Sequence, residues 1–205
     1  MYERMVELIQ RYKADVARCD DLSDETQISK KDQAEESTCG GAQYHELIYC
    51  DIWGGHVTDR LFKREVIGDV RFPHSKTIED MRFMRQILPN IRLEAHTSEK
   101  LYFYTVRQDN TSFVYARTFI NSYERAEEYQ SRYEEACSKY PEYKETLLIK
   151  STTFACGSIR ILLKENKKES EEYRKMLQFL KKNKKSIVAL KKIPIKYKLF
   201  LMVVR

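Results

Sequence analysis

Residues that interrupt helices are scarce in this chain of 205 residues, which has only six glycines and four prolines. This scarcity favours long helices over a turn-rich β-sandwich. Apolar residues make up 42% of the sequence, enough for a hydrophobic core, and the 14 tyrosines and nine phenylalanines exclude a disordered composition. The length fits one domain, or one compact half of a larger catalytic unit.

The spacing of apolar residues predicts strands and helices in the first part of the chain and helices alone after it. The predicted helices cover residues 2–13, 58–66, 78–88, 119–136, 141–164, 169–183 and 187–205. Extended segments are expected over 14–19 and 91–106, with a polar loop or loose hairpin over 20–43. The fold class is therefore α/β. The expected strands have no visible partners in the sequence, so a complete parallel sheet cannot be drawn from them.

Charge is distributed unevenly along the chain, whose formal net charge is +6. Residues 173–205 contain eleven Lys or Arg and no Asp or Glu, which leaves 26 basic against 31 acidic residues elsewhere. Lysines alternate with apolar residues in this basic tail, a pattern that fits a helix lying on an anionic membrane surface. The solvated face of a packing helix is the alternative. Nucleic acid is a third option, but the tail lacks Arg-rich and glycine-aromatic recognition patterns.

The cysteines indicate a reducing compartment. They are odd in number, widely spaced and free of any Cys-x-x-Cys pair, so a zinc site has no support. They are Cys19, Cys39, Cys50, Cys137 and Cys156. The N-terminal residues do not follow the charged, apolar, small-residue order of a secretory leader. We therefore expect a cytoplasmic location with free thiols, and no stretch of the roughly 18 apolar residues that a membrane span needs.

Two adjacent carboxylates, Glu79 and Asp80, begin the predicted helix 78–88. A carboxylate at this position can act as a general base on a hydroxyl group. The structural alternative is a capping box, because Thr77 precedes Asp80 by three residues. Acidic residues in a first helical turn also suit the helix dipole.

A polar loop that begins at Arg107 and Gln108 directly follows the aromatic strand 101–106. Guanidinium and amide groups at the end of a strand can bind a phosphate or a sugar. An ordinary polar loop is the alternative reading.

The single tryptophan, Trp53, precedes two glycines and His56. A tryptophan beside flexible glycines can stack on a sugar ring, and a buried core tryptophan is the equal alternative. The four histidines lie apart, without the spacing of metal ligands.

Taken in order, these motifs resemble bacterial family 2 glycosyltransferases over roughly residues 1–165. In that family a Trp precedes a Lys-Leu-Tyr-Arg-Arg-Glu run. Arg-Phe-Pro-Glu-Gly with Glu-Asp comes next, and then Tyr-Tyr-Tyr-Arg-Gln with a Ser beyond. The corresponding stretches here are Trp53, Arg60–Glu65, Arg71–Ser75, Glu79-Asp80, Tyr102–Gln108 and Ser112.

The resemblance implies a truncated GT-A-like mixed sheet with flanking helices over residues 1–115, the acceptor-side part of a catalytic domain. A C-terminal helical region with a basic amphipathic tail would occupy 116–205. The implied reaction is an inverting sugar transfer from a nucleotide-sugar to a glycan or lipid-linked acceptor in cell-surface polysaccharide synthesis. Asp80 would be the base, with Glu79 beside it.

The resemblance also places the remaining candidates. Arg107 and Gln108 would lie on a loop that closes over the donor phosphates, and Trp53 would lie against the acceptor. The tail, residues 173–205, would hold the enzyme at the inner membrane face.

Family members carry an N-terminal nucleotide-binding half that ends in an Asp-x-Asp motif, just before a Met-Tyr-Glu helix. This chain opens at Met1-Tyr2-Glu3 and has no such motif in a suitable place. The motif holds Mg²⁺ or Mn²⁺ against the leaving diphosphate. In metal-assisted reactions such an ion stabilises the transition state by several kcal/mol. We therefore expect an acceptor-side part that needs a separate N-terminal half. The alternative is a non-catalytic membrane-associated or partner-binding module derived from such an enzyme.

Overall fold

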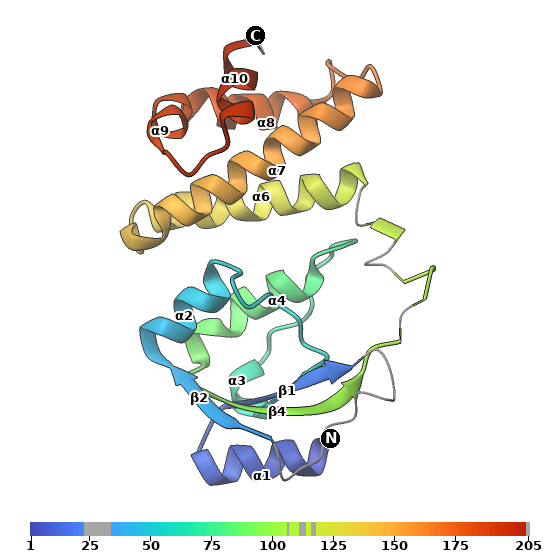
Figure 1. The fold of residues 1–205 in the computed structure, drawn as a ribbon, viewed down its shortest axis with the longest axis vertical. Coiled ribbons are helices and arrows are strands. Elements are labelled where there is room, and N and C mark those ends of the chain that lie inside the picture. The colour runs from blue at the N-terminus through green and yellow to red at the C-terminus, as the bar shows by residue number, and fades with distance from the viewer. Residues whose placement is uncertain (23–33, 106, 111–113, 116–117, 204–205) are drawn as a thin grey trace. The chain divides into compact units, whose positions relative to one another are not determined.

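A computed structural model of the chain describes residues 1–22, 34–105, 107–110, 114–115 and 118–203. It divides into two units, one of Met1–His74 with Glu79–Asn110 and one of Ser75–Ile78 with Thr111–Arg205 (Figure 1). The first unit contains a sheet with flanking helices, and the second is helical. The α/β class expected from the sequence is therefore confirmed.

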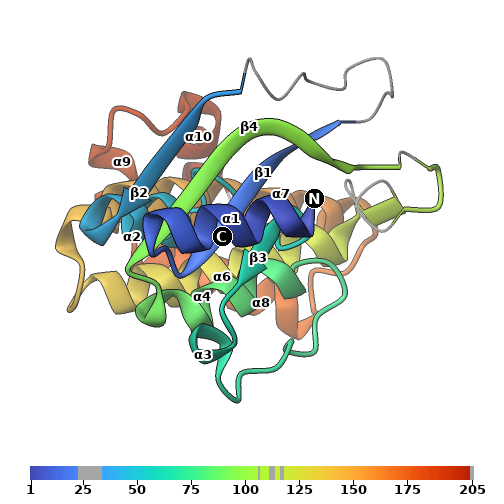
Figure 2. The ribbon, with the colours of Figure 1, turned by 90° about the horizontal axis from the view of Figure 1, so that it is seen from below.

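Four strands in the described part of the first unit form one sheet, in the order β2-β4-β1-β3 (Figure 2). They are β1 (Val16–Leu22), β2 (Glu36–Gly40), β3 (Arg60–Phe62) and β4 (Leu93–Phe103). The central pair, β1 and β4, is parallel, whereas the two outer strands pair antiparallel. The expectation that the strands lack partners is therefore wrong, because β1 has a neighbour on each side.

Two segments of this sheet differ from the sequence-based expectation. The predicted helix 58–66 is instead β3 followed by the short helix α3 (Arg64–Ile67), with Arg60 opposite Arg18 of β1. The predicted loop 20–43 contains the end of β1 and the strand β2, while 23–33 lie outside the described residues. Because β2 has little apolar alternation, its strand form is decided by backbone pairing with β4 and not by its side chains.

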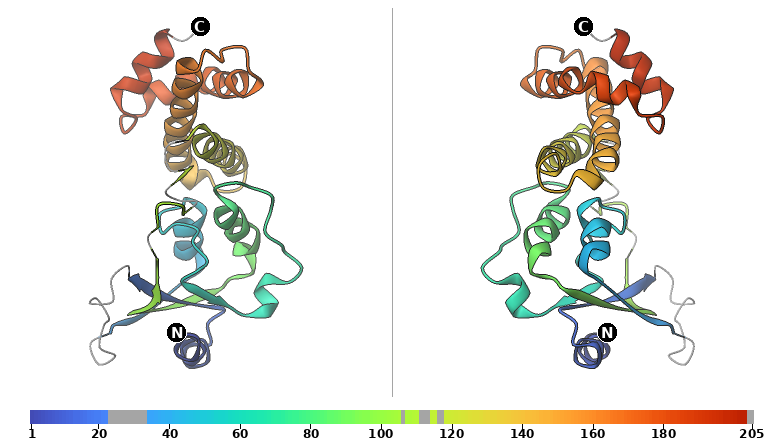
Figure 3. Two further views of the ribbon diagram at one scale, coloured as in Figure 1. Left: turned by 90° about the vertical axis from the view of Figure 1, so that its right-hand side faces the viewer. Right: turned by 90° about the vertical axis from the view of Figure 1, so that its left-hand side faces the viewer.

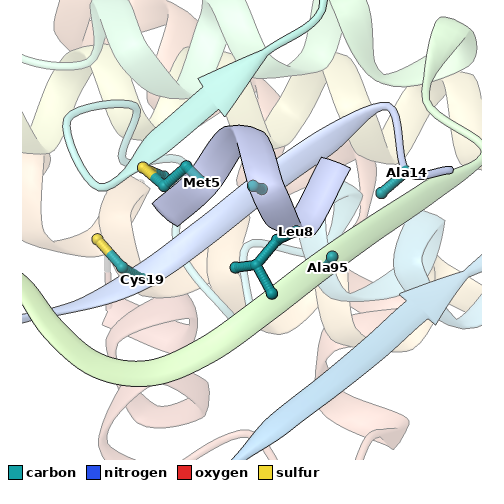
Figure 4. Packing of buried hydrophobic residues seen from close by; sticks show 6 residues of the cluster. Met5, Leu8, Ala14, Cys19 and Ala95 are labelled. Atoms are coloured by element: carbon teal, nitrogen blue, oxygen red, sulfur yellow. The ribbon is translucent and has the colours of Figure 1, made fainter. Parts of the chain in front are cut away.

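Helix α1 (Tyr2–Tyr12) is confirmed and covers one face of the sheet. Met5 and Leu8 pack there against the small buried side chains of the strands, which include Ala17, Cys19 and Ala95 (Figure 4). Small strand residues let the helix approach closely, so this face is an apolar core.

Glu36 of β2 ties α1 to the edge of the sheet. Its carboxylate accepts a hydrogen bond from Tyr12 Oη at 2.6 Å and pairs with the guanidinium groups of Arg4 and Arg11. The Tyr12 hydrogen bond and the Arg4 charge lower the pKa of Glu36 to about 2. The carboxylate therefore stays ionised at all physiological pH values.

The other face of the sheet carries α2 (Gly41–Tyr49) and α4 (Glu79–Ile87), with the 3-10 turn η3 (Leu88–Asn90) after α4 (Figure 1). Helix α4 confirms the helix predicted over 78–88. Because side chains alternate along a strand, the residues next to Ala17 and Ala95 point toward this second face. They include Arg18 and Glu94, so the second face is charged.

The second unit contains the helices that the sequence predicted, with one correction. They are α6 (Phe119–Ala136), the turn η4 (Pro141–Tyr143), α7 (Lys144–Lys164), α8 (Glu171–Lys182), α9 (Lys184–Ala189) and α10 (Ile195–Val203). Figure 3 shows α8, α9 and α10 gathered around α7. The single helix expected over 187–205 is wrong, because Pro194 cannot continue a helix and α10 begins after it.

Glu124 of α6 holds the segment 75–77 within this unit. Its buried carboxylate accepts hydrogen bonds from Ser75 Oγ, from the backbone N–H groups of Lys76 and Thr77, and from Thr77 Oγ1 at 2.7 Å. These bonds outweigh the effect of burial and lower the pKa of Glu124. The Thr77 hydroxyl therefore donates to Glu124, while Ser75 Oγ both donates to Glu124 and accepts the N–H of Ile78 at 3.2 Å. The capping role of Thr77 stays a prediction.

One helical stretch in the described part of the chain, Pro141–Lys164, is long and apolar enough to cross a membrane by composition. The expectation that no such stretch exists is therefore wrong. Half of its most apolar window is buried in the second unit, where α7 packs against α6 and α8. The core helices of helical bundles have the same composition, so this stretch does not by itself indicate a membrane span.

Candidate functional site

Asp80 and Glu79 form the first turn of α4. Asp80 is partly buried, and its carboxylate accepts a hydrogen bond from the backbone N–H of Val57. Burial, followed by the adjacent charge of Glu79, raises the pKa of Asp80. Glu79 Oε2 is also buried and has no hydrogen-bond partner among the described residues. The raised pKa makes the Asp80 carboxylate a stronger base.

The loop that follows Trp53 lies directly on α4. Gly54 has a φ of 73°, a left-handed conformation that glycine adopts without strain. A Cβ atom on Gly55 would lie 2.7 Å from the Cα atom of Met81, so only glycine fits against this turn. The sequence therefore brings the Val57 N–H to Asp80 by placing two glycines just before it.

Replacing Gly55 by alanine is expected to lower the free energy of unfolding by roughly 1–3 kcal/mol, because the new methyl group meets helix backbone that cannot move aside. The matched control is Gly157→Ala in α7, where the added Cβ meets only Ser122 Oγ at 3.8 Å. That control should be neutral or stabilising by up to about 1 kcal/mol, through helix propensity. Urea unfolding of the two variants measures both. Equal stabilities would contradict the close packing of Gly55 on α4.

His56, which the sequence analysis named beside Trp53, and Asp59, which it did not select, join Asp80 around this loop. Burial raises the pKa of Asp59, while the charges of Arg60, Arg18 and His56 act in the opposite direction. A His56 cation would also lower the pKa of Asp80, and the Asp59 carboxylate raises it. The site therefore combines carboxylates with an imidazole.

A buried ionic network supports this loop from the sheet side. Glu94 of β4 accepts hydrogen bonds from Arg60 Nε at 3.1 Å, Arg18 Nε at 3.0 Å and Tyr44 Oη at 3.0 Å. The side chains of Glu94 and Arg60 are each only 1% exposed. Arg60 also donates to the His56 carbonyl oxygen and pairs with Asp59 at 3.2 Å. Glu94 thus connects three elements to the loop that contacts Asp80.

Trp53 is held by the same network. The Arg18 guanidinium lies over its indole ring, with Cζ 5.1 Å from the ring centroid, and Tyr44 contacts it edge-on at 6.4 Å. The side chain is nevertheless 39% exposed, so Trp53 is not a buried core residue. Its exposed part offers an aromatic surface on the loop that leads to Asp80.

Arg107 and Gln108 are not brought to Asp80 by any contact in the described part of the chain. Both are exposed, and Arg107 bonds only within its own turn, to Asn110 Oδ1 at 3.3 Å and to Asp109 at 3.5 Å. Ser112, which belongs to the same motif, lies outside the described residues. The described part of this loop, residues 107–110, is an ordinary polar turn, and the role of the loop at the donor stays a prediction.

Among the described residues, no group of three or more His, Cys, Asp or Glu side chains could hold a metal ion. Asp80 and Glu79 therefore belong to no such group. Neither protein-family models nor curated proteins match the chain. The five cysteines are free.

The charged residues of this site carried only a weak signal in the sequence. Glu94 is one of several charged residues in and beside its strand, with Arg92, Glu99 and Lys100, and Arg60 starts the basic run. Their pairing joins residues 34 positions apart. Only the register of β1 between β3 and β4 brings them together.

Proposed function

We propose that this chain is the acceptor-side part of a nucleotide-sugar glycosyltransferase of the bacterial family 2, GT-A type. It would transfer a sugar with inversion to a glycan or lipid-linked acceptor in the cytoplasm. The ordered motifs support the family. The observation that carries the proposal is the partly buried Asp80 carboxylate with its raised pKa, next to a loop with an exposed tryptophan.

In the proposed reaction, Asp80 takes the proton of the acceptor hydroxyl group. The hydroxyl oxygen uses the electron pair of that O–H bond to attack the anomeric carbon of the donor sugar. The bond from this carbon to the diphosphate oxygen breaks on the opposite face, and the nucleoside diphosphate leaves with the bonding pair. The raised pKa of Asp80 favours its part, because proton transfer is best when the base has a pKa near the working pH.

Two further residues support this role for Asp80. The charge of Glu79 is one of the causes that raise the Asp80 pKa, so Glu79 would strengthen the base. Trp53 would stack on a sugar ring of the acceptor, since its exposed indole lies on the loop whose Val57 N–H fixes Asp80. Arg107 and Gln108 remain proposed contacts of the donor phosphates. Mg²⁺ or Mn²⁺ remains a proposal for the complete enzyme.

Fluorescence of Trp53 tests acceptor binding directly, because it is the chain's single tryptophan. We expect its emission to change on titration with at least one oligosaccharide of a panel of bacterial surface glycans. Nucleotide sugars alone should change it much less. A sugar alcohol at equal concentration is the control for viscosity and refractive effects. Unchanged emission with every glycan, while the chain stays folded by circular dichroism, would contradict acceptor binding at this site.

A transfer assay separates the enzyme from the alternative, a non-catalytic module derived from one. Adding the donor-binding half of a family 2 enzyme, in trans or fused before Met1, should restore transfer from a nucleotide sugar to the glycan found by fluorescence. Glycan binding without transfer in any such combination would favour the non-catalytic module.

A further inference from the structure

Helix α10 exposes an apolar face. Ile195, Leu199 and Met202 are 70%, 53% and 63% exposed, although each is a large apolar side chain. They are spaced by four and three residues, so at about 100° per residue they lie on one side of the helix. The opposite side is the packed one. Leu201 is buried there, and Tyr197 and Phe200 line a pocket with Cys156 and Gly157 of α7.

Lysines border this face. By the same helical geometry, Lys196 flanks it on one side and Lys198 on the other. Lys198 Nζ donates to the carbonyl oxygen of Val188 in α9 at 2.9 Å, which joins the two helices. Val188 is itself a partly exposed apolar residue, so α9 continues the apolar surface of α10.

Val188 also lines a strongly basic recess. The recess is formed by four lysines of α8 and α9 with Ser186, Val188 and Ala189, the lysines being Lys181, Lys182, Lys184 and Lys185. Lys182 pairs with Glu134 at 3.2 Å. Lys184, Lys185 and the nearby Lys191 have no carboxylate within 4.0 Å in the described part of the chain. Their charges are therefore available to an external anion.

We propose that α9 and α10 form a docking surface for an anionic phospholipid membrane. Ile195, Leu199 and Met202 enter the boundary between headgroups and acyl chains, and the surrounding lysines contact lipid phosphates. This division of labour is that of an amphipathic helix lying in a membrane interface. The surface belongs to the second unit and does not depend on the sugar-transfer chemistry proposed for Asp80.

The charge and polarity of the surface argue against other occupants. A second copy of the chain would bring its own α9 and α10 lysines against these, and the like charges would repel. Nucleic acid would satisfy the lysines but would leave the apolar side chains of α10 in water. An anionic membrane satisfies both sets of side chains.

Sedimentation of the full chain with vesicles tests this surface. We expect binding to phosphatidylcholine vesicles that contain phosphatidylglycerol, and binding that weakens as salt is raised. The triple variant Ile195→Ser, Leu199→Ser, Met202→Ser should lose roughly tenfold or more in affinity, because its apolar contacts are gone. The variant Lys184→Gln, Lys185→Gln, Lys191→Gln should lose a similar factor. Both replace exposed residues, so we expect both variants to fold, and thermal unfolding checks this.

Two control variants change the same kinds of residue elsewhere. Tyr2→Ser with Val6→Ser removes exposed apolar side chains of α1, and Lys164→Gln, Lys167→Gln, Lys168→Gln removes three positive charges between α7 and α8. Both should bind as the wild type does.

The proposal is overturned if the wild type does not bind anionic vesicles, if it binds neutral vesicles equally well, or if the controls lose as much affinity as the test variants. A dimer in sedimentation velocity that the Ile195 triple variant abolishes, without vesicle binding, would assign the face to a second copy.

Discussion

Replacing Glu94 by glutamine is expected to lower the free energy of unfolding by about 3–5 kcal/mol, the usual effect of removing one partner of a buried ion pair. Arg60 is as deeply buried as Glu94, and Asp59 would be the one carboxylate left to it among the described residues, beside a carbonyl oxygen and the Tyr44 hydroxyl. A guanidinium cannot lose its proton to avoid this cost. Removal of one charge therefore costs far more stability than the intact ion pair contributes, because the other charge is left buried without this partner.

Urea unfolding measures this effect, and two further variants calibrate it. Glu46→Gln makes the same change at an exposed position of α2 and should alter stability by less than about 0.5 kcal/mol. Tyr44→Phe removes one hydrogen bond to Glu94 and should cost on the order of 1 kcal/mol. Glu94→Gln should also shift the emission of Trp53, since Arg18 loses the carboxylate that holds it over the indole ring. A Glu94→Gln variant as stable as Glu46→Gln would contradict the buried network.

The second large effect concerns activity. In the complete enzyme, Asp80→Asn is expected to lower transfer by about 10²–10⁴-fold, the usual contribution of a general base. The folded chain should at the same time gain stability at pH 7, by on the order of 1 kcal/mol, because a partly buried charge beside Glu79 is removed. The asparagine oxygen can still accept the Val57 N–H. Activity and stability would therefore change in opposite directions.

The pH dependence of this gain follows from the direction of the Asp80 shift. A carboxyl group whose pKa is raised by folding favours the folded state while it is protonated, and this contribution is lost as pH rises through its folded pKa. The advantage of Asp80→Asn should therefore be present at neutral pH and vanish below about pH 4, where the aspartate is protonated in both states. Thermal unfolding across this range measures it.

Asp69→Asn is the matched control, since Asp69 is exposed in the turn that follows α3. It should change neither transfer by the Asp80 base nor the pH profile of stability. Normal turnover by Asp80→Asn would remove the base assignment. A stability loss at pH 7 would instead show that the charged form of Asp80 is favoured by its surroundings.

The sequence alone determined the helices whose apolar residues recur at helical spacing. The apolar stripes of α1, α4 and α7 recur at helical spacing, so their helices could be predicted without any partner. The position of Asp80 in a first helical turn followed from the same periodicity. The basic character of residues 173–205 was likewise complete in the sequence.

Tertiary structure decided the elements and contacts that depend on distant parts of the chain. Strand β2 forms because β4 supplies its backbone partners, and β3 replaces a predicted helix because β1 lies beside it. The pairing of Glu94 with Arg60 and the contact of Val57 with Asp80 depend on strand register and loop packing, for which a linear sequence has no period. In the same way, composition gave the lysines of the tail, but only the packing of α10 on α7 determined which apolar side chains face outward.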